Sequence, residues 1–281
     1  MAEMTDLSLL SRIIDSNSEI ERKKMKLTSK YYLIILLFFA FLIGIGTAPA
    51  FAANPQNEQA TNDMLTTYIK YRLMKDNLLV NNNIQVTVAN GVIKLQGTVP
   101  TLAAKKKAED DAHKVEESYA VVNELSIAKS GLTDEEIAKK VEQQIYNHVF
   151  YSIFDWITVE VNNGVVTLKG WVHLPWGDRQ FVSEAEKVPG VLEVKNEIQH
   201  ELGSDELRLQ AARLIYNDPR FEYYAYNQNP PIHIIVNGST LILEGQVRTE
   251  SDKNWAKSLL LFNTNAGTIQ NDLAVNPNLT Y

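Results

Sequence analysis

One pattern occurs three times in the chain and constrains its fold more than any other feature of the sequence. Residues 157–172 alternate apolar and polar side chains, pause at Asn163-Gly164 and then alternate again. Alternation on both sides of an Asn-Gly dipeptide predicts a β-hairpin, because Asn and Gly readily adopt the positive φ of a tight turn. Residues 85–99 and 232–247 carry the same pattern, so the chain contains an internal repeat.

Counting from one glycine in each hairpin aligns the three copies without a gap. Gly97, Gly170 and Gly245 each have a valine nine residues before them and an asparagine 26 residues after them. Apolar residues recur at helical spacing between the glycine and the asparagine, which predicts a helix followed by a short strand. These helices are expected at residues 102–117, 178–188 and 251–262.

A second helix is expected before each hairpin, and the second copy shows it most clearly. Thr133 and Glu136 have the spacing of a capping box, in which each side chain bonds the other residue's backbone N–H. Apolar residues then follow at every fourth position from Ile137 to Val149, which predicts one buried helix face.

Each copy therefore has the order helix–strand–strand–helix–strand over about 70 residues. The simplest way to bury such a unit is a two-layer α+β fold, a three-stranded mixed sheet with two helices on one face. The sequence predicts three tandem αββαβ domains of this kind, at residues 53–130, 131–201 and 202–281. The linkers are short, so the domains are expected to contact one another.

The first 52 residues are interpreted as a leader that contains a signal peptide. Lysines precede an almost wholly apolar run at residues 31–46, and Ala50-Phe51-Ala52 fits a small-residue cleavage site. The run is slightly shorter than the roughly 20 residues of a membrane span, which favours cleavage over a retained inner-membrane anchor facing the periplasm. Translation is expected to start at Met25, because the mixed-charge residues before it are unusual in a signal peptide, and the mature chain is expected to begin near Ala53.

The repeat resembles the BON domain (bacterial OsmY and nodulation). The second copy matches the pattern best, through Val159–Val172 and then Val188-Pro-Gly-Val-Leu-Glu-Val-Lys-Asn-Glu-Ile198. The third copy departs from it at Asn265-Ala-Gly267 and the first at Glu116-Glu-Ser-Tyr119, where the valine-proline-glycine-valine turn is blurred. The resemblance implies an extracytoplasmic, usually periplasmic, protein that binds phospholipid surfaces or partner proteins and has no catalytic residues. One osmotically inducible periplasmic member of the family is associated with chaperone-like activity under stress.

The composition and motifs argue against catalysis, metal binding and nucleic-acid binding. The chain has no cysteine, and its net charge of −7 provides no global basic field for nucleic acid. None of the five histidines has metal-ligand spacing with another histidine or a carboxylate cluster. No glycine-rich phosphate loop or nucleophile elbow occurs, because the repeated glycines belong to hairpins. We therefore expect no enzyme activity, no catalytic residue, no metal, no cofactor and no small-molecule substrate.

The candidate binding residues are those in which the copies differ. Aromatic and basic side chains at the start of a helix suit a lipid headgroup layer, and a lysine cluster suits an anionic leaflet, although covering the sheet or a neighbouring domain is an alternative role for the aromatics. The candidates are Trp171, Trp176, Arg179 and Phe181 in the second copy and Lys105, Lys106 and Lys107 in the first. The segment Asn227–Pro231, an insertion in the third copy, is a further difference.

Two functions from different classes remain open at this point. The first is a periplasmic protein that binds envelope phospholipid or client proteins during osmotic or other stress. The second is a scaffold module that docks onto an envelope protein complex through its sheet edges. Salt-sensitive binding to liposomes would favour the first function, and a saturable complex with one partner would favour the second.

Overall fold

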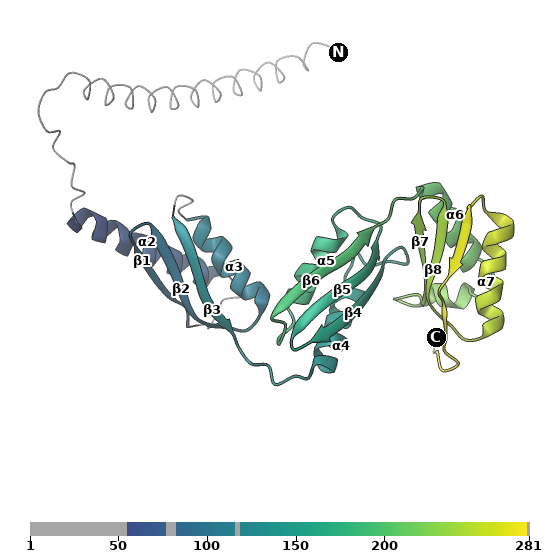
Figure 1. Cartoon of the computed structure of the whole chain (residues 1–281), viewed down its shortest axis with the longest axis horizontal. Coiled ribbons are helices and arrows are strands. Elements are labelled where there is room, and N and C mark those ends of the chain that lie inside the picture. The colour runs from purple at the N-terminus through teal and green to yellow at the C-terminus, as the bar shows by residue number, and fades with distance from the viewer. Residues whose placement is uncertain (1–54, 77–82, 116–118, 280–281) are drawn as a thin grey trace, which may run out of the picture. The chain divides into compact units, whose positions relative to one another are not determined.

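The computed structural model describes residues 55–76, 83–115 and 119–279 (Figure 1). Gln56–Tyr281 is the second of the two parts into which the chain divides. The predicted leader, the apolar run at 31–46, the start at Met25 and the cleavage site all lie outside the described residues. No helix of the described residues is long and apolar enough to cross a membrane.

The second part contains the predicted α+β repeats, each with the order helix–strand–strand–helix–strand. The first repeat consists of α2 (Pro55–Lys75), β1 (Gln85–Ala89), β2 (Val92–Val99), α3 (Leu102–His113) and β3 (Ala120–Ile127). The second consists of α4 (Asp134–Tyr146), β4 (Trp156–Asn162), β5 (Val165–Val172), α5 (Gly177–Glu186) and β6 (Glu193–His200). The third consists of α6 (Asp205–Tyr216), the 3-10 helix η1 (Glu222–Tyr226), β7 (Ile232–Asn237), β8 (Thr240–Val247), α7 (Glu250–Asn263), β9 (Thr268–Asn271) and β10 (Ala274–Val275).

All three sheets have the same mixed topology. The hairpin strands are antiparallel, and the strand that follows the second helix is parallel to the second hairpin strand, as in the order β1-β2-β3. In the third repeat this last strand is interrupted between β9 and β10, but both pieces pair with β8 in one register. In the first sheet, buried side chains of β1 and β2 alternate with exposed ones and share one core with the buried faces of α2 and α3. The helices therefore cover one face of the sheet, as predicted.

The repeated Asn-Gly dipeptides form tight turns because their backbones adopt positive φ. Asn90 and Asn163 both have φ 50°, followed by Gly91 at 72° and Gly164 at 76°. The third turn differs, since Asn237 pairs with Thr240 and Gly238, at φ 63°, takes the first central position. A positive φ at that position alone is the geometry of a type II′ turn.

The glycine used to align the copies is required by a close backbone approach. Gly97, Gly170 and Gly245 have φ of 128°, 118° and 105°, and each faces a carbonyl of the neighbouring strand or its approach. A Cβ at Gly170 would lie 1.9 Å from the Trp156 carbonyl oxygen. A side chain at this position would collide with the neighbouring backbone, so these glycines are structural residues.

The repeated asparagine joins the last strand of each repeat to the start of the preceding helix. The side-chain amide of Asn123 donates to the Lys105 carbonyl at 3.0 Å, and Asn271 donates to the Lys253 carbonyl at 2.7 Å. Asn196 donates instead to the carboxylate of Asp178, also at 3.0 Å. These bonds fix the crossover from helix to strand, so the asparagine is a structural residue.

The helix before the second hairpin begins as predicted but ends earlier. Thr133 and Glu136 form the capping box, and Ile137, Val141 and Ile145 are buried. The prediction that Val149 continues this buried face is wrong, because α4 ends at Tyr146 and Val149 is 83% exposed. A turn at Asn147–Phe150 moves Val149 out of the helical register and onto the surface.

Candidate functional site

The segment between α4 and β4 connects the second repeat to the third. The backbone N–H of Ile234, in β7, donates to the Ile153 carbonyl at 2.8 Å. Ile153 and Phe154 also pack against the hydrophobic core of the third repeat. Strand β7 is therefore buried on both faces, and its outer edge is occupied by the chain itself. An edge that is already paired cannot accept another strand without displacing this segment.

Two buried carboxylates hold this junction together. Asp155 is 1% exposed, and its carboxylate accepts hydrogen bonds from the backbone N–H of Ser152 at 3.0 Å and of His173 at 3.2 Å. Glu201, in the linker to α6, has a fully buried side chain and bonds Arg208 through Nη2 at 2.6 Å and Nε at 2.8 Å. Its other carboxylate oxygen accepts the backbone N–H of Val236 in β7. These bonds tie the linker to the third sheet.

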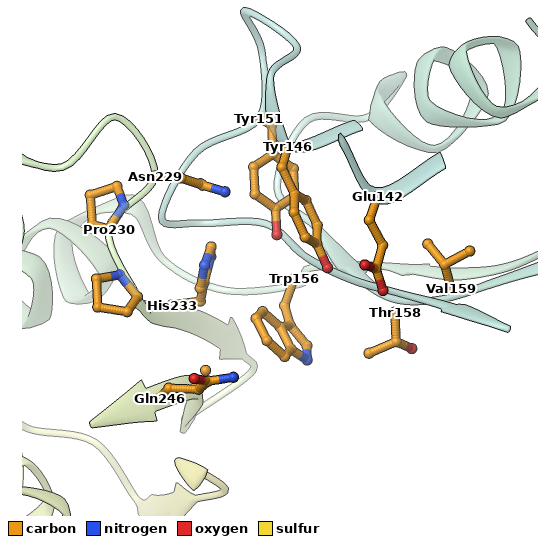
Figure 2. A pocket seen from close by; sticks show the side chains of 12 residues that line it. Glu142, Tyr146, Tyr151, Trp156, Thr158, Val159, Asn229, Pro230, His233 and Gln246 are labelled. Carbon is orange, nitrogen blue, oxygen red and sulfur yellow. The ribbon is translucent and has the colours of Figure 1, made fainter. Parts of the chain in front are cut away.

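A cleft of about 440 Å³ lies between the two repeats, and Figure 2 shows its side chains. Residues of α4, β4 and the connecting segment form one wall, and residues of the third repeat form the other. The lining residues are Glu142, Tyr146, Tyr151, Trp156, Thr158, Val159, Asn229, Pro230, Pro231, His233, Gly245 and Gln246. The insertion that distinguishes the third copy therefore contributes Asn229, Pro230 and Pro231 to this site.

The cleft keeps its shape through aromatic contacts and backbone bonds. The ring centroids of Tyr146 and Tyr151 are 5.0 Å apart, and those of Trp156 and His233 are also 5.0 Å apart. The hydroxyl of Tyr146 donates to the Ile157 carbonyl at 2.9 Å. A rigid wall of this kind loses little conformational freedom when a ligand binds.

Burial changes the charge states in the cleft. It raises the pKa of the Glu142 carboxyl, and together with the charge of Glu142 it raises the pKa of Tyr146 to about 12. Burial also raises the pKa of Tyr151 well above its usual range. It lowers the pKa of His233 to about 4, so this imidazole is neutral at physiological pH. Glu142 is the one lining residue of the cleft with a carboxyl group, and the lining includes no lysine or arginine.

A second exposed surface lies at the start of α5, and we call it the aromatic tip. It consists of Val149, Phe150, Trp176 and Arg179. Phe150 is 47% exposed and Trp176 is 36% exposed, and their rings meet edge to face with centroids 4.7 Å apart. Arg179 is also exposed, one turn of helix from Trp176. The predicted pair Trp176 and Arg179 thus belongs to one surface, which the turn after α4 enlarges.

The other two predicted residues of the second copy lie elsewhere. Phe181 is 1% exposed and belongs to the core of the second repeat, so it takes no part in the aromatic tip. Trp171 is half-buried in β5, opposite Trp156 in the sheet. The alternation of β5 directs Val166 and Leu168 to the core and therefore turns Trp171 to the other face of the sheet.

The predicted lysine cluster is largely neutralised by carboxylates. Lys106 pairs with Glu186 of the second repeat at 2.5 Å. Lys107 bonds Asp111 at 2.6 Å and Asp76 at 2.7 Å. Burial opposes the charge of Lys107, but its bonds to both carboxylates outweigh burial and raise its pKa. The Lys105 side chain is half-buried in α3. These lysines join elements of the protein more than they present positive charge to a ligand.

Few residues of the cleft could be recognised from the sequence. Glu142 is one polar residue on an amphipathic helix, and His233 occupies a strand position that alternation assigns to the outer face of its sheet. The differences between copies were informative, because the Asn227–Pro231 insertion and Trp156 both lie at the cleft. Among residues 55–76, 83–115 and 119–279 there is no group of three or more His, Asp or Glu side chains placed to hold a metal ion.

The protein is built from repeated αββαβ modules, with an exposed aromatic tip on the second repeat and a cleft between the second and third repeats. Residues 61–129 and 133–201 each match the family model described as "BON domain". The chain therefore contains two BON domains, which coincide with the first and second repeats.

Among solved structures, the chain is similar to two of CdsD, a structural protein of the type III secretion system of Chlamydia trachomatis, one of which is described as its C-terminal domain. Both are 11% identical to this chain with a TM-score of 0.24 and cover 76% of it, and the matches span 98% and 92% of the CdsD chains. No curated protein shows significant sequence similarity to the chain.

Proposed function

We propose that this protein is a non-enzymatic component of the cell envelope that binds phospholipid surfaces through its second repeat. The observation that carries the proposal is the aromatic tip, where Phe150 and Trp176 are exposed beside Arg179. Exposed aromatic rings next to a basic group match the chemistry of the membrane interface, which favours Trp at headgroup level and attracts cations. The two BON domains support an envelope location.

Binding through the tip is expected to be local and salt-sensitive. The net charge of −7 opposes approach to an anionic membrane, so the attraction must come from one face of the molecule. Arg179 contributes about 1 kcal/mol near an anionic leaflet, or about fivefold in affinity. The apolar area of Phe150 and Trp176 adds a contribution that salt does not screen.

Co-sedimentation with vesicles tests this proposal. The full chain is mixed with vesicles of phosphatidylglycerol and phosphatidylcholine, and wild type is compared with Trp176→Ala, Arg179→Ala. The double variant is expected to pellet at least fivefold less, with a further decrease at high salt. Trp255→Ala, Arg220→Ala is the matched control, because Arg220 lies over Trp255 at 5.0 Å on the third repeat. Equal pelleting of wild type and the Trp176 variant would remove the tip from the proposal.

A different observation favours the other binding role within the first function, binding of a client protein. Helix α2 exposes an apolar stripe at helical spacing, in which Met64 is 74%, Tyr68 49% and Tyr71 47% exposed. Apolar stripes of this kind typically pack against another helix. The test is suppression of aggregation of an unrelated unfolded client, for which Met64→Ser, Tyr68→Ser should lose activity while retaining vesicle binding.

We further propose that the third repeat is also a BON domain, which makes three in tandem. Its αββαβ order, strand register, glycine and asparagine correspond to those of the first two repeats. The interrupted last strand and the Asn227–Pro231 insertion are consistent with a divergent copy. Calorimetry of the full chain tests this assignment. A third repeat that shows no cooperative unfolding transition, either of its own or shared with the second repeat, would contradict it.

Export to the periplasm completes the proposal. The signal peptide pattern at residues 31–52 supports it, with an anchored protein facing the periplasm as the alternative. N-terminal sequencing of the exported protein tests the cleavage, with a mature start expected near Ala53. A mature chain that still contained Asp6 or Asp15 would contradict both the cleavage and the start at Met25.

A further inference from the structure

The cleft between the second and third repeats brings three aromatic side chains to one carboxylate. Tyr146, Tyr151 and Trp156 line it, and Glu142 lies one helical turn before Tyr146 on the same wall (Figure 2). Within residues 55–76, 83–115 and 119–279, the Glu142 carboxylate takes part in no hydrogen bond or ion pair. Half-buried carboxylates in folded proteins usually have a partner, so this group can accept hydrogen bonds from a ligand.

A second acceptor in the same cleft is also without a partner. His233 is 3% exposed, and its Nδ1 atom has no hydrogen-bond partner among the described residues. Burial keeps the ring neutral, and in the tautomer protonated at Nε2 the Nδ1 atom can accept a hydrogen bond. Two unpartnered acceptors in one cleft suit a ligand that brings N–H or O–H donors.

The charge of the cleft selects among such ligands. Its lining residues include no lysine or arginine, and Glu142 supplies a negative charge. The faces of Tyr and Trp rings add negative potential, which attracts organic cations within about 6 Å. A phosphate would meet only repulsion here, so a lipid phosphate or a nucleic acid does not fit the site.

We propose that this cleft binds the cationic side chain of a partner polypeptide, a lysine ammonium or an arginine guanidinium. Glu142 is the counter-ion, and Tyr146, Tyr151 and Trp156 form the aromatic walls. The N–H groups of the cation satisfy the unpartnered acceptors, and the volume of about 440 Å³ accommodates a long side chain. A phosphatidylethanolamine headgroup also has an ammonium, but its phosphate follows a few bonds away, where the cleft has no positive charge. This site is separate from the aromatic tip and does not depend on phospholipid binding there.

Calorimetric titration of the full chain tests the inference with defined probes. The cationic probes are Nα-acetyl-arginine amide and Nα-acetyl-lysine amide, and Nα-acetyl-citrulline amide is the neutral match for arginine. Glycerophosphoethanolamine represents the lipid headgroup, and N-acetylglucosamine represents a neutral hydroxyl donor. The cationic side chains are expected to bind at least tenfold more tightly than each of the other three probes.

Glu142→Gln keeps the shape of the site and removes its charge. It should weaken binding of the arginine probe about tenfold, the effect of one charge-assisted hydrogen bond. Glu135→Gln is the matched control, since Glu135 is exposed in the first turn of the same helix and does not line the cleft. Thermal unfolding verifies that both variants fold, and neither should change vesicle pelleting through the tip.

Each outcome decides the inference. Binding of both cationic probes that is lost in Glu142→Gln and retained in Glu135→Gln supports it. Equal binding of the citrulline and arginine probes, preference for the sugar or the lipid headgroup, or unchanged affinity in Glu142→Gln would overturn it. If neither cationic probe produces heat of binding at millimolar concentration, the inference is overturned as well.

Discussion

Replacing Glu201 by alanine should destabilise the junction between the second and third repeats. The Glu201 side chain is fully buried and joins three elements: its own linker, Arg208 of α6 and the backbone N–H of Val236 in β7. Arg208 is itself only 10% exposed and lies over the Phe154 ring at 5.7 Å. The substitution therefore leaves a buried guanidinium and a backbone donor without their acceptor.

The size of the effect follows from these contacts. Removing one partner of a buried ion pair costs about 3–5 kcal/mol. Asp205 still pairs with Arg208, but its side chain is 86% exposed, so we expect the lower end of that range. The unpaired Val236 N–H adds about 1 kcal/mol. The predicted loss in free energy of unfolding is thus about 3–4 kcal/mol.

Urea denaturation followed by tryptophan fluorescence measures this loss. Three of the four tryptophans lie in the second repeat, and Trp156 contacts His233 across the junction. Glu193→Ala, an exposed carboxylate at the start of β6, is the control and should change stability by less than about 0.5 kcal/mol. The double variant Glu201→Ala, Arg208→Met removes both charges, so it should recover about 1–2 kcal/mol relative to Glu201→Ala.

Two results would refute this reasoning. A loss below about 1 kcal/mol in Glu201→Ala would mean that water or Asp205 replaces the lost acceptor. A double variant no more stable than Glu201→Ala would mean that the unpaired guanidinium is not the source of the loss.

Two further predictions concern the third sheet and the repeated glycine. Gly170→Ala should destabilise the second repeat by more than about 3 kcal/mol, because its Cβ would lie 1.9 Å from a carbonyl oxygen. Gly131 also has a positive φ but faces open space, so Gly131→Ala should lose only about 1 kcal/mol. Equal losses of the two variants in urea denaturation would contradict the role of close approach. Burial and the neighbouring Asp272 raise the pKa of Glu244 to about 7, so its contribution to stability is present at low pH and lost as pH rises from about 4.5 through 7. The full shift corresponds to about 3 kcal/mol, and solvent screening of this half-buried carboxyl reduces it to about 1 kcal/mol. Glu244→Gln should therefore gain about 1 kcal/mol over wild type between pH 5 and pH 8 in urea denaturation, and parallel pH profiles of the two proteins would contradict this.

The repeated architecture could be predicted because it depends on local patterns. Period-2 alternation, Asn-Gly turns and apolar residues at helical spacing each specify an element within a few neighbouring residues. Counting from Gly97, Gly170 and Gly245 then located the crossover strands, since the offset to the asparagine is constant. The structure explains why these two residues recur, because the glycine position leaves no room for a Cβ and the asparagine supplies a side-chain amide donor.

The sites depended on contacts between residues distant in sequence. The sequence predicted Trp176 and Arg179 as binding residues but could not separate exposed Trp176 from buried Phe181. Trp176 is the N-cap of the short helix that contains Phe181, and the direction of each side chain follows from how α5 packs. In the sequence, Lys106 and Lys107 have the pattern of free positive charges. The fold pairs them with Glu186 and Asp76, which are distant in sequence.

The sequence by itself determined the repeat, the α+β class and the order of elements within each copy. Only the tertiary structure decided that the third copy's insertion and the second copy's α4 form two walls of one cleft. It also decided that Glu142 and His233 lack partners there. The physical reason is that backbone geometry is encoded by neighbours in the chain, whereas burial, charge pairing and cavities arise between surfaces that the chain brings together only when it folds.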